Sequence, residues 1–162
     1  MEPETLFANF RESLEAIIAP RFYETERGFQ GELLTQLSKR LRLSDPAIVE
    51  QEYQKRQHVH GLSIRPDLII HEPFDLGHHS SRTEGNIAVV ELKLNASANK
   101  AAQAFQSLAA MLNVLEYPIG IFVNIGTTET YADLVPQEVK GRIALYAVSL
   151  NESHVYVVEE RT

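Results

Sequence analysis

Three charged residues interrupt two short apolar stretches of the chain: Asp67 in IRPDLIIH, and Glu91 and Lys93 in IAVVELKL. Side chains of a strand alternate between its two faces, so Glu91 and Lys93 would project to the same side. A carboxylate and an ammonium on the face of a sheet are unfavourable unless they are paired or bound to a metal ion. These residue types therefore offer either an ion pair or a cation site.

Two predicted strands, 64–71 and 87–94, carry the three residues, because both runs are rich in β-branched residues. If these strands are hairpin partners, Asp67 and Glu91 converge within the reach of one metal ion. A connection rich in turn-forming residues, from 72 to 86, joins them. Connections of that length are uncommon unless they are functional or mobile.

Helical and strand patterns cover most of the remaining chain. Apolar residues at helical spacing predict helices, and short apolar or alternating runs predict strands. The predicted helices are 4–19, 26–42 and 97–116, and the further predicted strands are 47–56, 118–125, 143–149 and 154–159. This order, without a repeat or a linker, predicts one α/β domain over residues 1–162 with a mixed sheet.

The composition is that of a globular protein, with 44% apolar and 23% charged residues among 162. The absence of cysteine excludes disulfides, thiolate zinc sites, iron–sulfur clusters and cysteine nucleophiles. No stretch approaches the roughly 20 apolar residues that cross a membrane. Acidic residues stand where a signal peptide would carry lysine or arginine. We therefore expect a cytoplasmic protein with no membrane partner.

The chain resembles the PD-(D/E)xK nuclease superfamily, whose fold is also called restriction-endonuclease-like. The matching residues are Pro66-Asp67 and Glu91-Leu92-Lys93, and their placement on successive strands before a long helix makes the match more specific than the short motif alone. The family's core order of helix, three strands, helix and strand matches residues 26–125. The resemblance implies an α/β fold with an αβββαβ core, in which helices flank a mixed central sheet.

The resemblance also implies a metal site. Asp67, Glu91 and the backbone carbonyl of Leu92 would bind Mg²⁺, for which Mn²⁺ would substitute. Lys93 would orient the attacking water or offset the charge that develops on the phosphate. The activity implied is hydrolysis of phosphodiester bonds in nucleic acid, by a DNA endonuclease or exonuclease.

Two helices would add further site residues. Family members often place a glutamate on the helix before the first strand, and Glu32 sits where that residue would be, as an outer or water-mediated metal ligand. Some branches of the family carry a glutamine on the helix after the lysine. Gln103 and Gln106 both qualify, and the spacing favours Gln106.

Each of these site residues also has a simpler, structural interpretation. Asp67, Glu91 and Lys93 would form a structural ion pair between strands, and Glu32 and the glutamines would be solvated helix surface. At the level of the whole chain, the alternative to an enzyme is a catalytically inactive nuclease-fold module that binds protein or nucleic acid within a larger system.

Basic residues concentrate around the predicted strand 47–56, where they would contact the phosphates of nucleic acid. They are Lys39, Arg40, Arg42, Lys55 and Arg56, and ordinary surface charge is the alternative. The net charge of −7 argues against a general nucleic-acid coat but allows an enzyme with a local basic patch. No DNA-reading element such as a helix-turn-helix is visible, so specificity would come from loops, dimerisation or a protein partner.

Two further expectations concern the surface. We expect the six histidines to be exposed. His71 shares the strand parity of Asp67 and is the histidine that would reach substrate.

We also expect a twofold dimer, because the two C-terminal strands add apolar residues beyond the family core. Tyr146, Val155, Tyr156 and Val157 would cover the sheet edge or pack against a second copy. The alternative is that these strands complete the sheet of the monomer.

Overall fold

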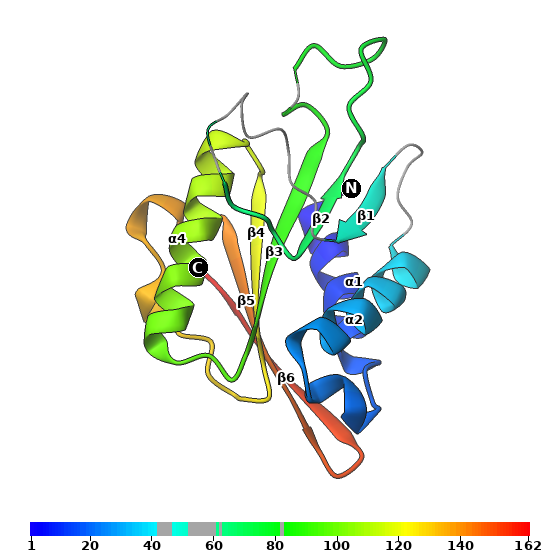
Figure 1. Cartoon of the computed structure of the whole chain (residues 1–162), viewed down its shortest axis with the longest axis vertical. Helices are drawn as coiled ribbons and strands as arrows, with labels where there is room; N and C mark the ends of the chain where they lie inside the picture. Colours follow the sequence, from blue (N-terminus) through cyan, green and yellow to red (C-terminus); the bar gives the residue numbers. More distant parts are fainter. Residues whose placement is uncertain (42–46, 52–60, 62, 82) are drawn as a thin grey trace.

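A mixed β-sheet separates two layers of helices (Figure 1). The structure is a computed structural model, and it describes residues 1–41, 47–51, 61, 63–81 and 83–162. The helices α1 (Pro3–Glu15) and α2 (Glu26–Arg40) cover one face of the sheet, and α4 (Ala98–Val114) covers the other. Short 3₁₀ helices, η1 (Pro20–Tyr23), η2 (Ala132–Leu134) and η3 (Gln137–Val139), lie in the connections.

The strands lie in the sheet in their order along the chain, from β1 to β6. Their bounds are β1 (Ile48–Gln51), β2 (Leu68–His71), β3 (Asn86–Leu94), β4 (Ile119–Ile125), β5 (Ile143–Asn151) and β6 (His154–Arg161). The neighbours β3, β4 and β5 run parallel, whereas the outer pairs are antiparallel. β4 is buried along almost its whole length, as expected for a parallel strand covered on both faces.

Two apolar cores hold the layers together. On one face, Phe29 and Leu33 of α2 pack with α1 against a set of strand residues that includes Leu92. On the other face, Phe105 of α4 meets Phe122 of β4 edge to face, with ring centroids 4.8 Å apart. Successive side chains of β3 point into opposite cores: Val90 and Leu92 pack on the side of α1 and α2, and Val89 packs on the side of α4.

Side-chain caps fix where α2 and α4 begin. Thr25 Oγ1 accepts a hydrogen bond from the backbone N–H of Gly28 at 3.0 Å, and Ser97 Oγ accepts one from Lys100 N–H at 3.4 Å. Such caps satisfy N–H groups that the first helical turn leaves without partners. As a result, Glu26 stands at the start of α2 and Lys100 in the first turn of α4.

The strand expected at 64–71 is shorter than the pattern predicted. β2 begins at Leu68, because Pro66 has no N–H group with which to join a strand ladder. Asp67 therefore stands just before the strand. β2 and β3 are antiparallel neighbours, with Leu68 opposite Val90, as the hairpin prediction required. Of the predicted strand 47–56, the structure shows β1, and residues 52–56 lie outside the described residues.

Hydrogen bonds within the connection between β2 and β3 hold it in place. Asp75 O accepts a hydrogen bond from His79 N–H at 2.8 Å, and Asp75 Oδ1 accepts one from Gly77 N–H at 2.8 Å. Ser80 donates to Glu84 from both its N–H and its hydroxyl group. This connection projects from the sheet at the end of β2 opposite to Asp67 (Figure 1).

His71 is buried and the side chain of His79 is largely covered, so the prediction of six exposed histidines is wrong for these two. His71 is 3% exposed, and its Nε2 lies 2.7 Å from Glu50 Oε2, which links β1 and β2. The side chain of His79 is 5% exposed, with Nε2 3.5 Å from Glu72 Oε2. A polar partner offsets the burial of each ring, namely Glu50 for His71 and, for His79, the N–H of Asp75, which donates a hydrogen bond to Nδ1 at 3.1 Å. His78 and His154 are exposed, and His58 and His60 lie outside the described residues.

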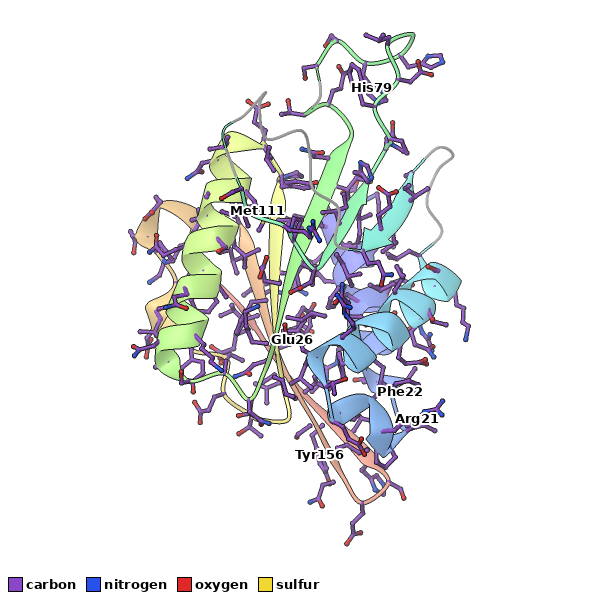
Figure 2. All side chains as sticks on the ribbon, in the orientation of Figure 1. Arg21, Phe22, Glu26, His79, Met111 and Tyr156 are labelled. Carbon is purple, nitrogen blue, oxygen red and sulfur yellow. The ribbon has the colours of Figure 1, made fainter. Side chains whose placement is uncertain are left out.

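The C-terminal strands complete the sheet of this chain, with β5 beside β4 and β6 at the outer edge. Tyr146 is buried against Phe10 of α1, with ring centroids 5.2 Å apart, so it does not face a second copy. Tyr156 on β6 is exposed (Figure 2). The twofold dimer stays a prediction.

In the part of the chain that the structure describes, no helix is both long and apolar enough to cross a membrane.

Candidate active site

The C-terminal end of β3 extends past its antiparallel partner, and two carboxylates bind the backbone there. β2 does not extend far enough to pair with the N–H groups of Leu92 and Leu94. Asp67 Oδ2 accepts a hydrogen bond from Leu92 N–H at 2.7 Å, and Glu26 Oε2 accepts one from Leu94 N–H at 3.1 Å. The residue before β2 and the first turn of α2 are thereby tied to the same edge of β3.

The ammonium group of Lys93 lies among three carboxylates. Its Nζ is 3.4 Å from Glu91 Oε2, 3.9 Å from Glu26 Oε1 and 4.0 Å from Asp67 Oδ2. The same Nζ donates a hydrogen bond to the carbonyl oxygen of Leu92 at 2.7 Å. Glu91 and Lys93 thus lie on one side of β3, and Asp67 converges with them. We refer to Glu26, Asp67, Glu91, Lys93 and the Leu92 carbonyl as the Lys93 cluster; Figure 2 labels Glu26 at the start of α2.

Burial makes the carboxyl group of Glu91 difficult to ionise. The residue is 6% exposed, and desolvation, together with the charge of Asp67, raises its pKa to about 8, although Lys93 acts in the opposite direction. Burial alone lowers the pKa of Lys93, but the charges of Glu91, Asp67 and Glu26 raise it above its ordinary value. Near neutral pH, Lys93 is therefore charged. A further positive charge close to Glu91 would lower the pKa of its carboxyl group and favour ionisation.

A cavity of about 410 Å³ opens beside the cluster. One face of α4 contributes side chains at helical spacing, namely Lys100, Gln103, Ala104 and Ser107. Ile64 and Arg65 line the cavity from the segment before β2, and Glu26, Glu91 and Lys93 line it from the cluster. Arg65 and Lys100 add positive charge to that of Lys93, and such a surface suits a phosphodiester.

Glu32 does not reach the cluster. Its Oε1 accepts a hydrogen bond from Gln36 Nε2 at 2.6 Å, and Gln36 in turn accepts one from Arg40. An α-helix turns about 100° per residue, so Glu32 lies roughly 120° around α2 from Glu26. It also lies on the order of 9 Å further along the helix axis. Glu26 occupies the position that we expected for Glu32.

The spacing of the apolar residues on α2 is a sequence signal for Glu26. The apolar stripe of α2 runs through Phe29, Leu33 and Leu37, which pack against the sheet. One step backward along that stripe leads to Glu26, three residues before Phe29. The same face carries Gln30, whose Nε2 donates a hydrogen bond to the backbone carbonyl of Asp67 at 2.7 Å. α2 therefore holds the Asp67 segment through Gln30 and the β3 edge through Glu26.

Of the two candidate glutamines, both of which are exposed, Gln103 lines the cavity and Gln106 does not. The reason is the rotation of the helix. Ala101, Phe105 and Leu108 are buried against the sheet, and this rotation places Gln103 with Lys93 at the cavity. Lys100 and Arg65, which the sequence analysis did not single out, lie at the same cavity.

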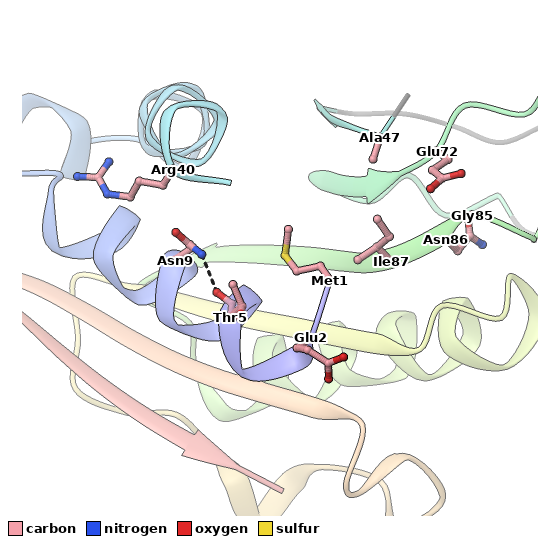
Figure 3. Close-up of a pocket in the computed structure, with 10 residues that line it drawn as sticks. All are labelled: Met1, Glu2, Thr5, Asn9, Arg40, Ala47, Glu72, Gly85, Asn86 and Ile87. Carbon is pink, nitrogen blue, oxygen red and sulfur yellow. Dashed lines mark hydrogen bonds between the residues drawn. The ribbon is translucent and has the colours of Figure 1, made fainter. Parts of the chain in front are cut away.

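The described residues of the predicted basic patch lie away from the cluster. Lys39 and Arg40 stand at the C-terminal end of α2, whereas Glu26 stands at its start. Arg40 lines a different cavity of about 520 Å³, which Asn86 and Ile87 border at the beginning of β3 (Figure 3). Arg42, Lys55 and Arg56 lie outside the described residues.

The oxygen atoms of the cluster fit a hard cation such as Mg²⁺. Within the described ranges, no three histidine, cysteine, aspartate or glutamate side chains are grouped so as to hold a metal ion. Mg²⁺ does not require such a group, because proteins usually bind it through one or two carboxylates while it keeps several water molecules. The carboxylates of Asp67 and Glu91 and the Leu92 carbonyl surround one ammonium and meet that requirement.

Comparison with solved structures identifies the fold. Neither a protein-family model nor a curated protein sequence matches the chain. The cAAA-bound form of NucC from E. coli MS115-1 matches 99% of this chain and 84% of its own, with a TM-score of 0.53 and 13% identity. The fold is nuclease-like. The expected restriction-endonuclease-like α/β fold, with a mixed sheet flanked by helices, is confirmed.

Pyrococcus furiosus SfsA in complex with Ca²⁺ is also similar. It matches 90% of this chain and 64% of its own, with a TM-score of 0.40 and 14% identity.

Proposed function

We propose that the chain is a Mg²⁺-dependent nuclease that hydrolyses phosphodiester bonds of DNA, as an endonuclease or an exonuclease. The Lys93 cluster carries the proposal, because its three carboxylates and a backbone carbonyl surround one ammonium beside a cavity. The nuclease-like fold agrees with it, as does the resemblance of Pro66-Asp67 and Glu91-Leu92-Lys93 to the superfamily motif.

Each residue of the cluster has a role in this proposal. Asp67, Glu91 and the Leu92 carbonyl would hold the metal ion, which when bound supplies a more acidic water and stabilises charge on the phosphate. Lys93 would place its positive charge against the scissile phosphate. Lys100, on the α4 wall of the cavity, would hold an adjoining phosphate of the same strand.

A cleavage assay tests the proposal. The purified chain is incubated with plasmid DNA, single-stranded DNA or RNA, with Mg²⁺, with Mn²⁺ or with a chelator. We expect cleavage of DNA that requires the divalent cation. Asp67→Asn and Lys93→Met should each lower the rate by about 100-fold or more, because each removes a charge that acts on the reacting groups. Glu32→Gln, which changes a carboxylate of α2 outside the cluster, is the matched control and should cleave at the wild-type rate.

Cleavage at the wild-type rate in both Asp67→Asn and Lys93→Met would contradict the site assignment. Circular dichroism of each variant, compared with the wild-type spectrum, separates a loss of activity from a loss of folding.

A module that binds without catalysis is the second candidate, and the hydrogen bonds of the carboxylates favour it. Asp67 and Glu26 each accept a hydrogen bond from a backbone N–H of β3, and Lys93 pairs with Glu91, so the cluster is internally satisfied without a metal ion. Calorimetry with Mn²⁺ separates the two candidates. Binding that Asp67→Asn abolishes supports the nuclease, whereas absence of binding together with absence of cleavage supports the module.

A further inference from the structure

The ammonium of Lys93 lies where the proposed metal ion would bind. Nζ is 2.7 Å from the Leu92 carbonyl oxygen and within 4.0 Å of one oxygen from each of Glu91, Asp67 and Glu26. A Mg²⁺ ion bound to that carbonyl would lie about 2.1 Å from it. The Lys93 ammonium and a Mg²⁺ ion cannot both lie against the Leu92 carbonyl oxygen at these distances, because their positive charges repel each other.

The oxygen atoms of Asp67, Glu26 and the Leu92 carbonyl have partners other than Lys93 that hold their positions. Asp67 Oδ2 is held by the N–H of Leu92, and Glu26 Oε2 by the N–H of Leu94. The Leu92 carbonyl belongs to β3, which pairs with β4 as far as Leu94. The backbone of β3 therefore positions these groups whichever rotamer the Lys93 side chain adopts.

The cavity beside the cluster gives the lysine side chain room to move. The side chain is 27% exposed, and it lines the cavity together with Gln103 and Ser107 of α4. A rotation about its side-chain bonds would move Nζ from the Leu92 carbonyl toward this space without requiring a change in β3.

We propose that Lys93 closes the metal site of the free protein and that loading of the metal requires its ammonium to leave the Leu92 carbonyl. This inference rests on the proposed function, since it assigns the same oxygen atoms to the metal ion. Only molecules whose site is open bind the metal ion. The apparent metal affinity is therefore the affinity of the open site multiplied by the fraction of molecules that are open. Lys93 would then have two positions, against Leu92 without metal and in the cavity with metal.

Calorimetric titration of the full chain with Mn²⁺ tests this inference. We expect Lys93→Gln to bind Mn²⁺ about tenfold more tightly than wild type, because the competing ammonium is gone. Removal of any nearby positive charge also strengthens cation binding, so Lys100→Gln is the matched control. Lys100 lines the same cavity, and its replacement should change the affinity less than about threefold.

The outcomes distinguish failure of this inference from failure of the proposed function. If Asp67→Asn abolishes Mn²⁺ binding but Lys93→Gln binds no more tightly than Lys100→Gln, the site is a metal site and the closure by Lys93 is wrong. If wild type and Lys93→Gln both fail to bind Mn²⁺, or if Asp67→Asn binds as wild type does, the proposed metal site and this inference fail together.

A measurement on the wild-type chain avoids any effect of the variants on folding. Acetic anhydride acetylates lysine amines that are free of strong contacts, and mass spectrometry measures the modification at each lysine. We expect Mg²⁺ to raise the acetylation of Lys93 several-fold relative to Lys100, because the metal ion releases its ammonium from the Leu92 carbonyl. Equal acetylation of Lys93 with and without Mg²⁺, at a concentration that saturates calorimetric binding, would overturn the inference.

Discussion

At the scale of single residues, the candidate site depends on the proton of Glu91. Its pKa of about 8 means that the carboxyl group holds a proton at neutral pH in the absence of metal. A divalent cation binds the carboxylate form, so the metal-bound protein holds fewer protons than the free protein. Metal binding must therefore strengthen as the pH rises toward the pKa of Glu91.

We expect the Mn²⁺ affinity of the wild-type chain to rise between about pH 6 and pH 8, by up to roughly tenfold per pH unit, and to level off above that range. Calorimetry across this range measures the affinity, and heats in buffers of different ionisation enthalpy count the protons released. Glu91→Gln removes the titrating group and should bind Mn²⁺ weakly, without this pH dependence. A wild-type affinity that stays constant from pH 6 to pH 8 would contradict the role given to Glu91.

The contacts among these residues were predictable to different degrees. Alternation along one strand requires Glu91 and Lys93 to share a side, so the sequence was sufficient for that pair. Asp67 required the further assumption that β2 and β3 are neighbours, which the structure bears out. Arg65 and Lys100 were not predictable, because an isolated basic residue carries no pattern that places it at a cavity.

At the scale of elements, the rotation of each helix about its axis decides which polar side chains reach the site. The apolar stripe of α2 faces the sheet and brings Glu26 to β3, whereas Glu32 contacts Gln36. The stripe predicted that the helix exists and which face is buried. It did not identify Glu26, because an apolar stripe is defined by its apolar residues and Glu26 is a charged residue that precedes them.

Matched substitutions on α2 test this rotation through stability. Glu26→Ala leaves the N–H of Leu94 without its partner and removes an acidic residue from the start of a helix. We expect it to lower the free energy of unfolding by about 1 kcal/mol, a value reduced by the partial exposure of Glu26. Glu32→Ala should stay within about 0.5 kcal/mol of wild type. Urea unfolding of both variants measures the difference, and equal losses would show that Glu26 does not hold the edge of β3.

At the scale of the whole molecule, the order of the elements was predictable and the course of the long connections was not. The helix at 97–116 and the strand at 118–125 are confirmed because both are long and strongly patterned. Residues 72–85 carry no period in the sequence, and hydrogen bonds such as that between His79 N–H and Asp75 O fix the path of the described residues 72–81 and 83–85. The sequence could not show that the side chain of His79 would be largely covered there.

The net charge of the molecule is −7, yet Arg65, Lys93 and Lys100 gather at one cavity. Two acidic residues that are counted in this formal total, Glu26 and Glu91, line the same cavity. Net charge alone therefore neither supports nor excludes binding of an anionic polymer at this site, since the field near a cavity depends on the local groups. The nuclease-like fold brings these opposite charges together at one end of β3.

Anomalous diffraction from crystals of the wild-type chain grown with Mn²⁺ tests the metal-dependent site most directly. We expect an anomalous peak at the C-terminal end of β3, about 2.1 Å from the carboxylates of Asp67 and Glu91 and from the Leu92 carbonyl. Lys93 Nζ should no longer lie against that carbonyl. A map with no peak at these oxygen atoms at saturating Mn²⁺, with Lys93 Nζ still bound to the Leu92 carbonyl, would contradict the site.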